Sequence, residues 1–129
     1  MSTKANLKKA LAGEGIANRK YLAFAKKAEE ENYPEVAELF KKIAEEETHH
    51  AFEEMELLGI VKKTKQNLKN AIKGEEKEST KMYPEFAAKA EQENNKLAAD
   101  RFREIANDEK IHAGKYKEAL ANLKRKKWK

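Results

Sequence analysis

The chain has 129 residues, of which 40% are charged, and a formal net charge of +5 at pH 7. It contains no cysteine, which excludes disulfides, zinc fingers and iron centres held by thiolates, and no apolar run approaches the roughly 20 residues that span a bilayer. A chain of this length builds one hydrophobic core, so we expect a single domain over residues 1–129 that is cytoplasmic and has no membrane partner.

Four amphipathic helices are predicted, because only 2 Pro and 5 Gly interrupt a sequence dominated by Ala, Glu, Lys and Leu. Thr3 and Thr64 are expected to cap the first and third helices, while Pro34 begins the second and Gly59 ends it. The predicted helices cover about residues 3–31, 34–59, 64–94 and 96–123. The basic tail 124–129 is expected to be solvated, so a nucleic-acid partner is not favoured; an acidic partner or weak nucleic-acid binding is the alternative.

The second half of the chain repeats the first. Glu14 recurs as Glu75 at an offset of 61 residues, whereas Tyr21 recurs as Tyr83 at an offset of 62. Two copies of a helical hairpin are too few for a solenoid, so the repeat predicts an all-α four-helix bundle. The two predicted hairpins cover about residues 3–59 and 64–123.

The change of offset places one extra residue in the third helix between Glu75 and Tyr83. A helix absorbs an extra residue most easily as a π-bulge, which is frequent at functional sites, so we predict one in this interval. Pro84 lacks an N–H and would disturb the helical ladder just beyond it. The bulge is expected to turn Glu78 inward beside Glu75, as a carboxylate that the first hairpin does not match.

Two Glu-x-x-His motifs, Glu47 with His50 and Glu109 with His112, lie on the inward stripes of the second and fourth helices. Residues three apart share a helix face, so each motif can direct a carboxylate and an imidazole at one metal pair. Each remaining helix adds an inward glutamate, and this set is the pattern of carboxylate-bridged dinuclear sites in four-helix bundles. The predicted metal ligands are Glu14, Glu47, His50, Glu75, Glu78, Glu109 and His112.

A metal-free bundle whose polar core residues are hydrogen-bonded is the alternative to a metal site. Glu46 and His49 form a third Glu-x-x-His pair, but they lie on an outer row and should face solvent. Tyr21 and Tyr83 are either packing residues or, as we favour, tyrosines whose hydroxyls bond to ligand carboxylates. Oxygen and nitrogen ligands suit two iron ions, and manganese and zinc remain open.

The motifs resemble the di-iron domain of the rubrerythrins, within the ferritin-like superfamily. The residues that carry the resemblance are Gly13-Glu14, Tyr21, Glu47-x-x-His50, Gly74-Glu75-x-x-Glu78, Met82-Tyr83-Pro84 and Glu109-x-x-His112. It covers nearly the whole chain and implies a non-haem di-iron peroxidase that reduces hydrogen peroxide to water. By this resemblance, Glu47 and Glu109 would bridge the two irons, with Glu14 and Glu75 as terminal ligands.

The resemblance also implies that one ligand changes with oxidation state. His112 would hold one iron, while the other would move between His50 and Glu78. Glu78, Tyr21 and Tyr83 are therefore the candidate catalytic residues. Many rubrerythrins carry a rubredoxin domain whose iron is held by four cysteines. This chain has no cysteine, so we expect its electrons to come from a separate rubredoxin-like donor.

The connection between the two hairpins constrains how a ferritin-like bundle can form. Helices of about 25 residues are about 38 Å long, whereas the link from Ile60 to Lys63 spans at most about 14 Å. The bundle is therefore either up-down-up-down or completed by a second chain. Short hinges favour exchange, and the resemblance includes rubrerythrin-like proteins that are swapped dimers, so we expect a domain-swapped homodimer with two di-iron sites.

Other functional classes remain open at this point. A ferroxidase or another iron-handling ferritin-like protein would use the same ligands, and a DNA-coating mini-ferritin would use the basic tail. A metal-free helical interaction module is the structural alternative. The sequence does not separate a peroxidase from an oxidase, because both use di-iron carboxylate sites.

Overall fold

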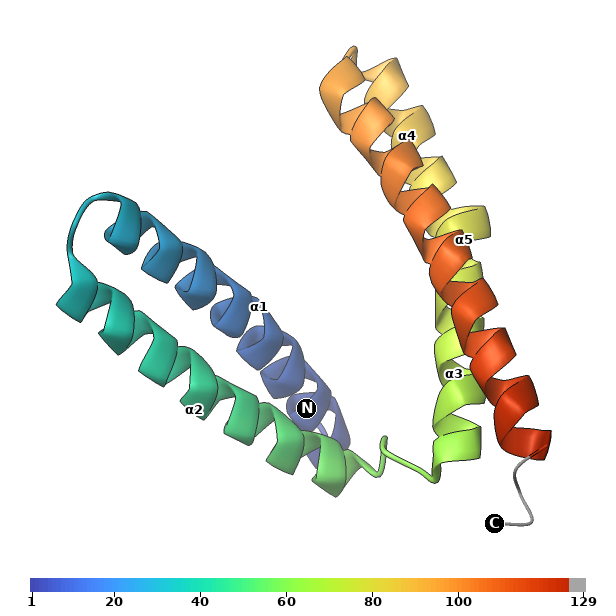
Figure 1. The fold of residues 1–129 in the computed structure, drawn as a ribbon, viewed down its shortest axis with the longest axis horizontal. Helices are drawn as coiled ribbons and strands as arrows, with labels where there is room; N and C mark the ends of the chain where they lie inside the picture. The colour runs from blue at the N-terminus through green and yellow to red at the C-terminus, as the bar shows by residue number, and fades with distance from the viewer. Residues whose placement is uncertain (126–129) are drawn as a thin grey trace. The chain divides into compact units, whose positions relative to one another are not determined.

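The computed structural model describes residues 1–125, and all regular structure within them is helical. The elements, shown in Figure 1, are α1 (Thr3–Glu30), α2 (Pro34–Leu58), α3 (Thr64–Lys77), the π-helical turn η1 (Glu78–Met82), α4 (Tyr83–Gln92) and α5 (Lys96–Arg125). The prediction of an all-α fold is confirmed. The prediction of a solvated basic tail concerns side chains of residues 124–129, which lie outside the described ones.

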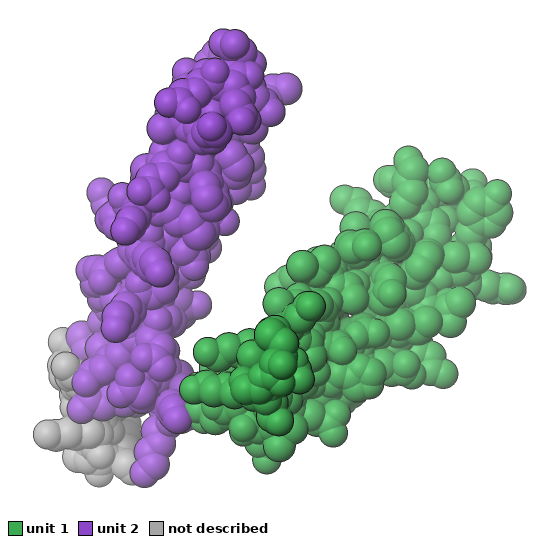
Figure 2. Space-filling view, turned by 180° about the vertical axis from the view of Figure 1, so that it is seen from behind, with its two compact units in different colours: residues 1–61 green, residues 62–129 purple. Residues whose placement is uncertain are grey.

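The chain divides into two compact units, residues 1–61 and 62–129, which Figure 2 distinguishes by colour. In the first unit, α2 folds back along α1 to form one helical hairpin (Figure 1). In the second unit, α3, η1 and α4 follow one another as a single rod, and α5 packs along all three. The repeat of two hairpins inferred from the sequence is therefore confirmed.

The helix starts differ from the prediction by one residue. Ser2, not Thr3, caps α1, and its hydroxyl oxygen accepts a hydrogen bond from the backbone N–H of Ala5 at 3.1 Å. Lys63 occupies the cap position of α3 and makes no side-chain cap bond. The predicted caps were wrong because Thr3 and Thr64 already belong to the first helical turns, where the side chain no longer lies outside the helix.

The hairpin turns use residues that tolerate left-handed backbone. Asn32 and Asn94, which correspond in the repeat, have φ angles of 65° and 59°. Asparagine adopts this conformation more readily than most side chains, so each turn reverses the chain within a few residues. Gly59 ends α2 with a φ of 67°, as predicted for a glycine cap, and Pro34 begins α2 as predicted.

The buried residues of each hairpin are alanines, which we call the alanine seam. The buried residues are Ala25, Ala28, Ala37 and Ala44 in the first hairpin, and Ala87, Ala90, Ala99 and Ala113 in the second. Small side chains let two helices approach closely, but they bury little apolar surface. Larger side chains lie beside this seam and stay open to solvent within their own hairpin; Phe24 is 43% exposed and Phe86 is 44% exposed.

The π-bulge predicted between Glu75 and Tyr83 is confirmed as η1. Its hydroxyl side chains bond to one backbone carbonyl: Ser79 Oγ and Thr80 Oγ1 donate to the Glu76 carbonyl at 3.2 and 2.6 Å. Side-chain donors of this kind satisfy carbonyls where the regular ladder is disturbed. The bulge lets the aromatic residues after it keep the same face as in the first hairpin, although the intervening segment is one residue longer.

Candidate metal centre

The first hairpin brings three predicted ligands together, Glu14 from α1 and Glu47 and His50 from α2. His50 Nδ1 lies 3.4 Å from Glu14 Oε2 and 3.8 Å from Glu47 Oε2. One donor atom from each residue lies within 4.8 Å of the other two. The helices meet here because the alanine seam holds them close, and the spacing of three residues places Glu47 and His50 on one face of α2.

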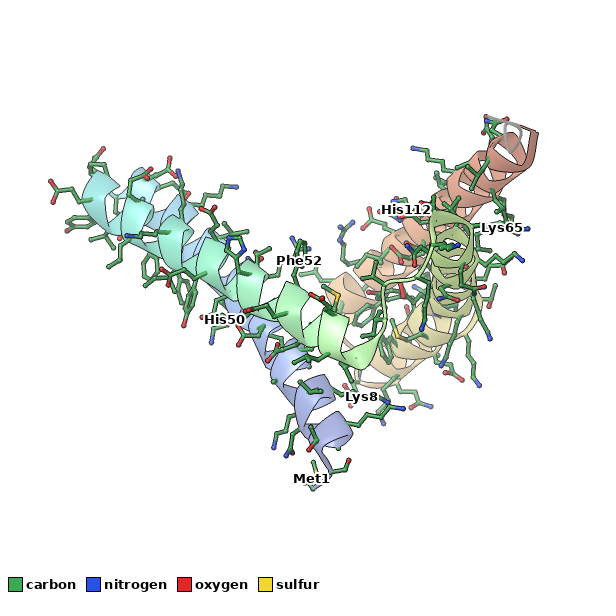
Figure 3. All side chains as sticks on the ribbon, turned by 90° about the horizontal axis from the view of Figure 1, so that it is seen from below. Met1, Lys8, His50, Phe52, Lys65 and His112 are labelled. Atoms are coloured by element: carbon green, nitrogen blue, oxygen red, sulfur yellow. The ribbon has the colours of Figure 1, made fainter. Side chains whose placement is uncertain are left out.

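The second hairpin repeats this arrangement with Glu75 from α3 and Glu109 and His112 from α5. His112 Nδ1 lies 3.5 Å from Glu75 Oε1 and 3.4 Å from Glu109 Oε1. The donor atoms again lie within 4.8 Å of one another. Figure 3 shows His50 on the first hairpin and His112 on the second. We call these two groups the first and second ligand clusters.

The glutamates of both clusters are mostly covered by their own hairpins, whereas the histidines are not. The four glutamate side chains are between 15% and 20% exposed, but those of His50 and His112 are 55% and 48% exposed. The sequence predicted inward stripes for all six residues. A pair of helices covers such a stripe from one side only, so the imidazoles stay accessible from the open face of each hairpin.

The donor set fits a divalent cation. Glu14 Oε2 and Glu75 Oε2 are both buried and neither accepts a hydrogen bond. A buried carboxylate oxygen without a donor is unfavourable, and a cation is the partner that would satisfy it. Carboxylate oxygens together with imidazole nitrogens are suitable ligands for iron or manganese.

Glu78 adds a further carboxylate to the second cluster only. It is half-buried and begins η1, where its side chain hydrogen-bonds to Glu109. That hydrogen bond, followed by burial and by repulsion from the Glu109 charge, raises the pKa of Glu78 above its usual 4.5. Two carboxyl groups in contact favour either a shared proton or a cation, so Glu78 can respond to whether a metal is bound beside it.

Tyr21 and Tyr83 belong to two matching aromatic groups, one in each hairpin. The ring of Tyr21 stacks on Phe40 with centroids 6.1 Å apart, and that of Tyr83 lies 5.9 Å from Phe86. Within residues 1–125 neither hydroxyl makes a hydrogen bond. The expected bond from these hydroxyls to ligand carboxylates is not made inside either hairpin, and a catalytic role for the two tyrosines stays a prediction.

Comparison with known proteins identifies the family of this chain. The family model described as Rubrerythrin matches residues 5–120. The chain belongs to the rubrerythrin family. It is 36% identical to a putative rubrerythrin of Methanocaldococcus jannaschii, covering 94% of this chain and 70% of that protein. A rubrerythrin of Porphyromonas gingivalis is 38% identical, covering 94% of this chain and 67% of that protein.

Among solved structures, the chain is similar to nigerythrin in its fully reduced, all-ferrous state, with 34% identity and a TM-score of 0.49. That match covers 96% of this chain and 68% of the nigerythrin chain. Rubrerythrin membership, together with the two helical hairpins, confirms the predicted all-α, ferritin-like fold class and supports a di-iron protein of the oxidoreductase class. No helix within residues 1–125 is long and apolar enough to cross a membrane.

One residue of this rubrerythrin-family site was missed by sequence reasoning. The amide of Asn18 donates to the Ala44 carbonyl at 2.8 Å and to Thr48 Oγ1 at 2.9 Å, which ties α1 to α2 beside the first cluster. Asn18 lies one helical turn after Glu14 and Thr48 directly follows Glu47. The sequence signal that could have identified Asn18 is its position: it is a polar residue between Glu14 and Tyr21, on the inward stripe of the first helix.

Two other positions complete the description of the site. Glu46 and His49 are exposed, as predicted for the outer Glu-x-x-His pair. Glu54, one turn after His50, has a buried Oε1 atom without a hydrogen-bond partner. Tyr116 stands at the corresponding position of the second hairpin, so the two repeats differ at this level.

Proposed function

We propose that the protein is a di-iron peroxidase that reduces hydrogen peroxide to water with electrons from a separate donor protein. The observation that carries the proposal is the pair of ligand clusters, each with two largely covered glutamates and one histidine. The additional carboxyl of Glu78 beside Glu109 also supports it.

The proposed ligands are those predicted from the sequence, and they divide between the two hairpins. Glu47 and Glu109 are proposed as bridging ligands, and Glu14 and Glu75 as terminal ligands. In each cluster the histidine Nδ1 faces the carboxylates, which suits it to share their cation. The complete list of proposed ligands is Glu14, Glu47, His50, Glu75, Glu78, Glu109 and His112.

Reduction of one peroxide molecule to two waters consumes two electrons and two protons. Two ferrous ions supply one electron each when they are bound. The hydrogen bond to Glu109 raises the pKa of the Glu78 carboxyl, and we propose Glu78 as a group that exchanges protons with Glu109 beside the site. Glu78 and His50 are proposed as alternative ligands of one cation, each in one oxidation state. Tyr21 and Tyr83 are proposed to orient ligand carboxylates through their hydroxyls.

The electron donor is proposed to be a rubredoxin-like protein. The 129 residues contain no cysteine and therefore no rubredoxin iron site of their own. The net charge of +5 favours an acidic donor, because opposite charges accelerate and orient a transient encounter. Rates of reduction by an acidic rubredoxin that fall as the salt concentration rises would support this arrangement.

Anaerobic stopped-flow mixing of the ferrous protein with hydrogen peroxide and, separately, with dioxygen tests the proposed reaction. If the protein is a peroxidase, peroxide oxidises its ferrous ions much faster than dioxygen does. Because each peroxide takes up two electrons, one peroxide should be consumed per iron pair. Faster oxidation by dioxygen would instead identify a ferroxidase or an oxidase. Failure of the protein to retain iron or manganese after purification without chelator would leave only a metal-free module.

The two hairpins are proposed to meet as a domain-swapped homodimer, in which the first hairpin of one chain completes a ferritin-like bundle with the second hairpin of the other. Each hairpin has an alanine seam as its buried core and leaves large apolar side chains exposed, such as Phe24 and Phe86. Two helices with this pattern need a further apolar partner to bury that surface.

Complementation between two inactive variants tests the swap. Glu47→Ala disables the first cluster and Glu109→Ala the second, so neither homodimer contains an intact site. After co-refolding, a swapped heterodimer has one site with both clusters intact and one with both disabled, which restores about a quarter of wild-type activity. A bundle formed within one chain has no intact site in any mixture, so absence of recovery would contradict the swap.

A further inference from the structure

We propose that each hairpin is a metal site in its own right, so that the dinuclear centre is loaded as two separate mononuclear sites rather than in one concerted step. This inference rests on the proposed metal centre and concerns how its ligands are divided along the chain. Each half would hold one divalent cation through two glutamates and one histidine, before or without the other half.

Three of the four distances within the clusters fall in the range expected between neighbouring ligands of one cation, and the fourth, from His50 Nδ1 to Glu47 Oε2, slightly exceeds it. Ligand atoms about 2.1 Å from an ion, at angles of 90° to 120°, lie about 3.0 to 3.6 Å apart. In the first cluster His50 Nδ1 lies 3.4 Å from Glu14 Oε2 and 3.8 Å from Glu47 Oε2. All three donors therefore converge without a contribution from the second hairpin.

The second cluster reaches the same geometry independently. His112 Nδ1 lies 3.5 Å from Glu75 Oε1 and 3.4 Å from Glu109 Oε1. Its helices differ from those of the first hairpin by the π-helical turn η1, yet the three donors again lie within 4.8 Å of one another. The same donor set arises from two differently built hairpins, which indicates that each hairpin by itself arranges its ligands.

Burial and charge also balance within each half. In each cluster one buried oxygen, Glu14 Oε2 or Glu75 Oε2, accepts no hydrogen bond, so each half contains an atom that a cation would satisfy. Two carboxylates and a neutral imidazole carry a charge of about −2, which one divalent cation neutralises. The exposed imidazoles give an ion a route into each half from solvent.

Metal stoichiometry in two triple variants of the full chain tests the proposal. One variant carries Glu14→Ala, Glu47→Ala and His50→Ala; the other carries Glu75→Ala, Glu109→Ala and His112→Ala. Equilibrium dialysis of each metal-free protein against manganese(II), with metal analysis, should give two ions per chain for the wild type and one for each variant. Circular dichroism and the oligomeric state of each variant establish that it has folded.

The outcomes separate this inference from the proposed function. Two ions in the wild type and none in either or both variants would show that the site fills only as a whole, which overturns the inference and leaves the dinuclear centre standing. No ions in the wild type would overturn both. Two ions in a variant would show that the three residues it replaces are not required as ligands, which also overturns both.

Electron paramagnetic resonance of the wild type gives a second test that needs no substitution. With separate halves of similar affinity, one manganese(II) per chain should leave about half of the bound ions isolated, which gives a strong six-line signal after free ion is removed. A second equivalent should replace it with the broad signal of a coupled pair. A coupled signal that dominates from the first addition would overturn separate loading.

Discussion

Asn18 links α1 to α2 beside the first ligand cluster. Replacing it should lower both the stability of the fold and the metal affinity of that cluster. Its side-chain amide donates to the Ala44 carbonyl at 2.8 Å and to Thr48 Oγ1 at 2.9 Å, in a part-buried contact between α1 and α2. Glu14 lies one turn before Asn18 on α1, and Glu47 directly precedes Thr48 on α2. Asn18→Ala removes the polar link that holds these two helices in register beside the ligands.

The magnitude follows from the two bonds. Each contributes about 0.5 to 1 kcal/mol to stability, so the metal-free Asn18→Ala protein should lose about 1 to 2 kcal/mol. For a chain of this size, that lowers the melting temperature by about 3 to 10 °C. If the whole loss is coupled to metal binding, the affinity of the first cluster falls by about 5- to 30-fold. The second cluster belongs to the other hairpin and should keep its affinity.

Thermal and urea unfolding of the metal-free protein, followed by calorimetric titration with manganese(II), measure both effects. Asn70→Ala is the matched control, because Asn70 is exposed and its side-chain oxygen accepts a hydrogen bond from Gln66 of the same helix, at 3.0 Å. This control also reports the gain in helix propensity that alanine brings at both positions. If Asn18→Ala and Asn70→Ala gave the same stability and the same metal affinities, the link between the helices would have no part in forming the site.

Three further predictions concern the second cluster. Glu109→Ala should abolish binding of at least one metal ion, and undiminished binding of two ions per chain would refute its bridging role. Glu78→Ala should keep both ions but slow oxidation by peroxide; unchanged stopped-flow kinetics would remove Glu78 from the mechanism. The pKa of Glu78 is raised in the fold, so its contribution to stability is fully present below its usual pKa of 4.5 and is lost as the pH rises through the raised value. Metal-free Glu78→Gln should therefore be more stable than the wild type at pH 7 but not below pH 4.5, and urea midpoints that differ equally at both pH values would contradict this reasoning.

The candidate metal ligands could be proposed from the sequence because their spacing is a property of the helix. Glu47 and His50 are three residues apart, so any regular helix places them on one face. The repeat then supplied the matching pair and the two single glutamates. The π-bulge was predictable for a similar reason. The two halves share one pattern of inward-facing residues, so a single extra residue in the third helix must be absorbed where it occurs.

Contacts between helices could not be read from the sequence in this way. The hydrogen bond between Glu78 and Glu109 depends on how η1 faces α5, and the bonds of Asn18 depend on the register of α1 against α2. The cap of α1 was missed by one residue because Ser2 and Thr3 are both good capping residues and only the backbone path decides between them.

Taken alone, the sequence determined the number and type of helices, the doubled hairpin, the face that carries each ligand and the place of the π-helical turn. All of these follow from periodicity along one chain segment. Only the tertiary structure decided that the helices of each hairpin meet through alanines, that three ligands converge within each hairpin, and that the imidazoles remain open to solvent. The physical reason is that helical spacing fixes directions around one axis, whereas distances between side chains on two axes depend on the packing between them.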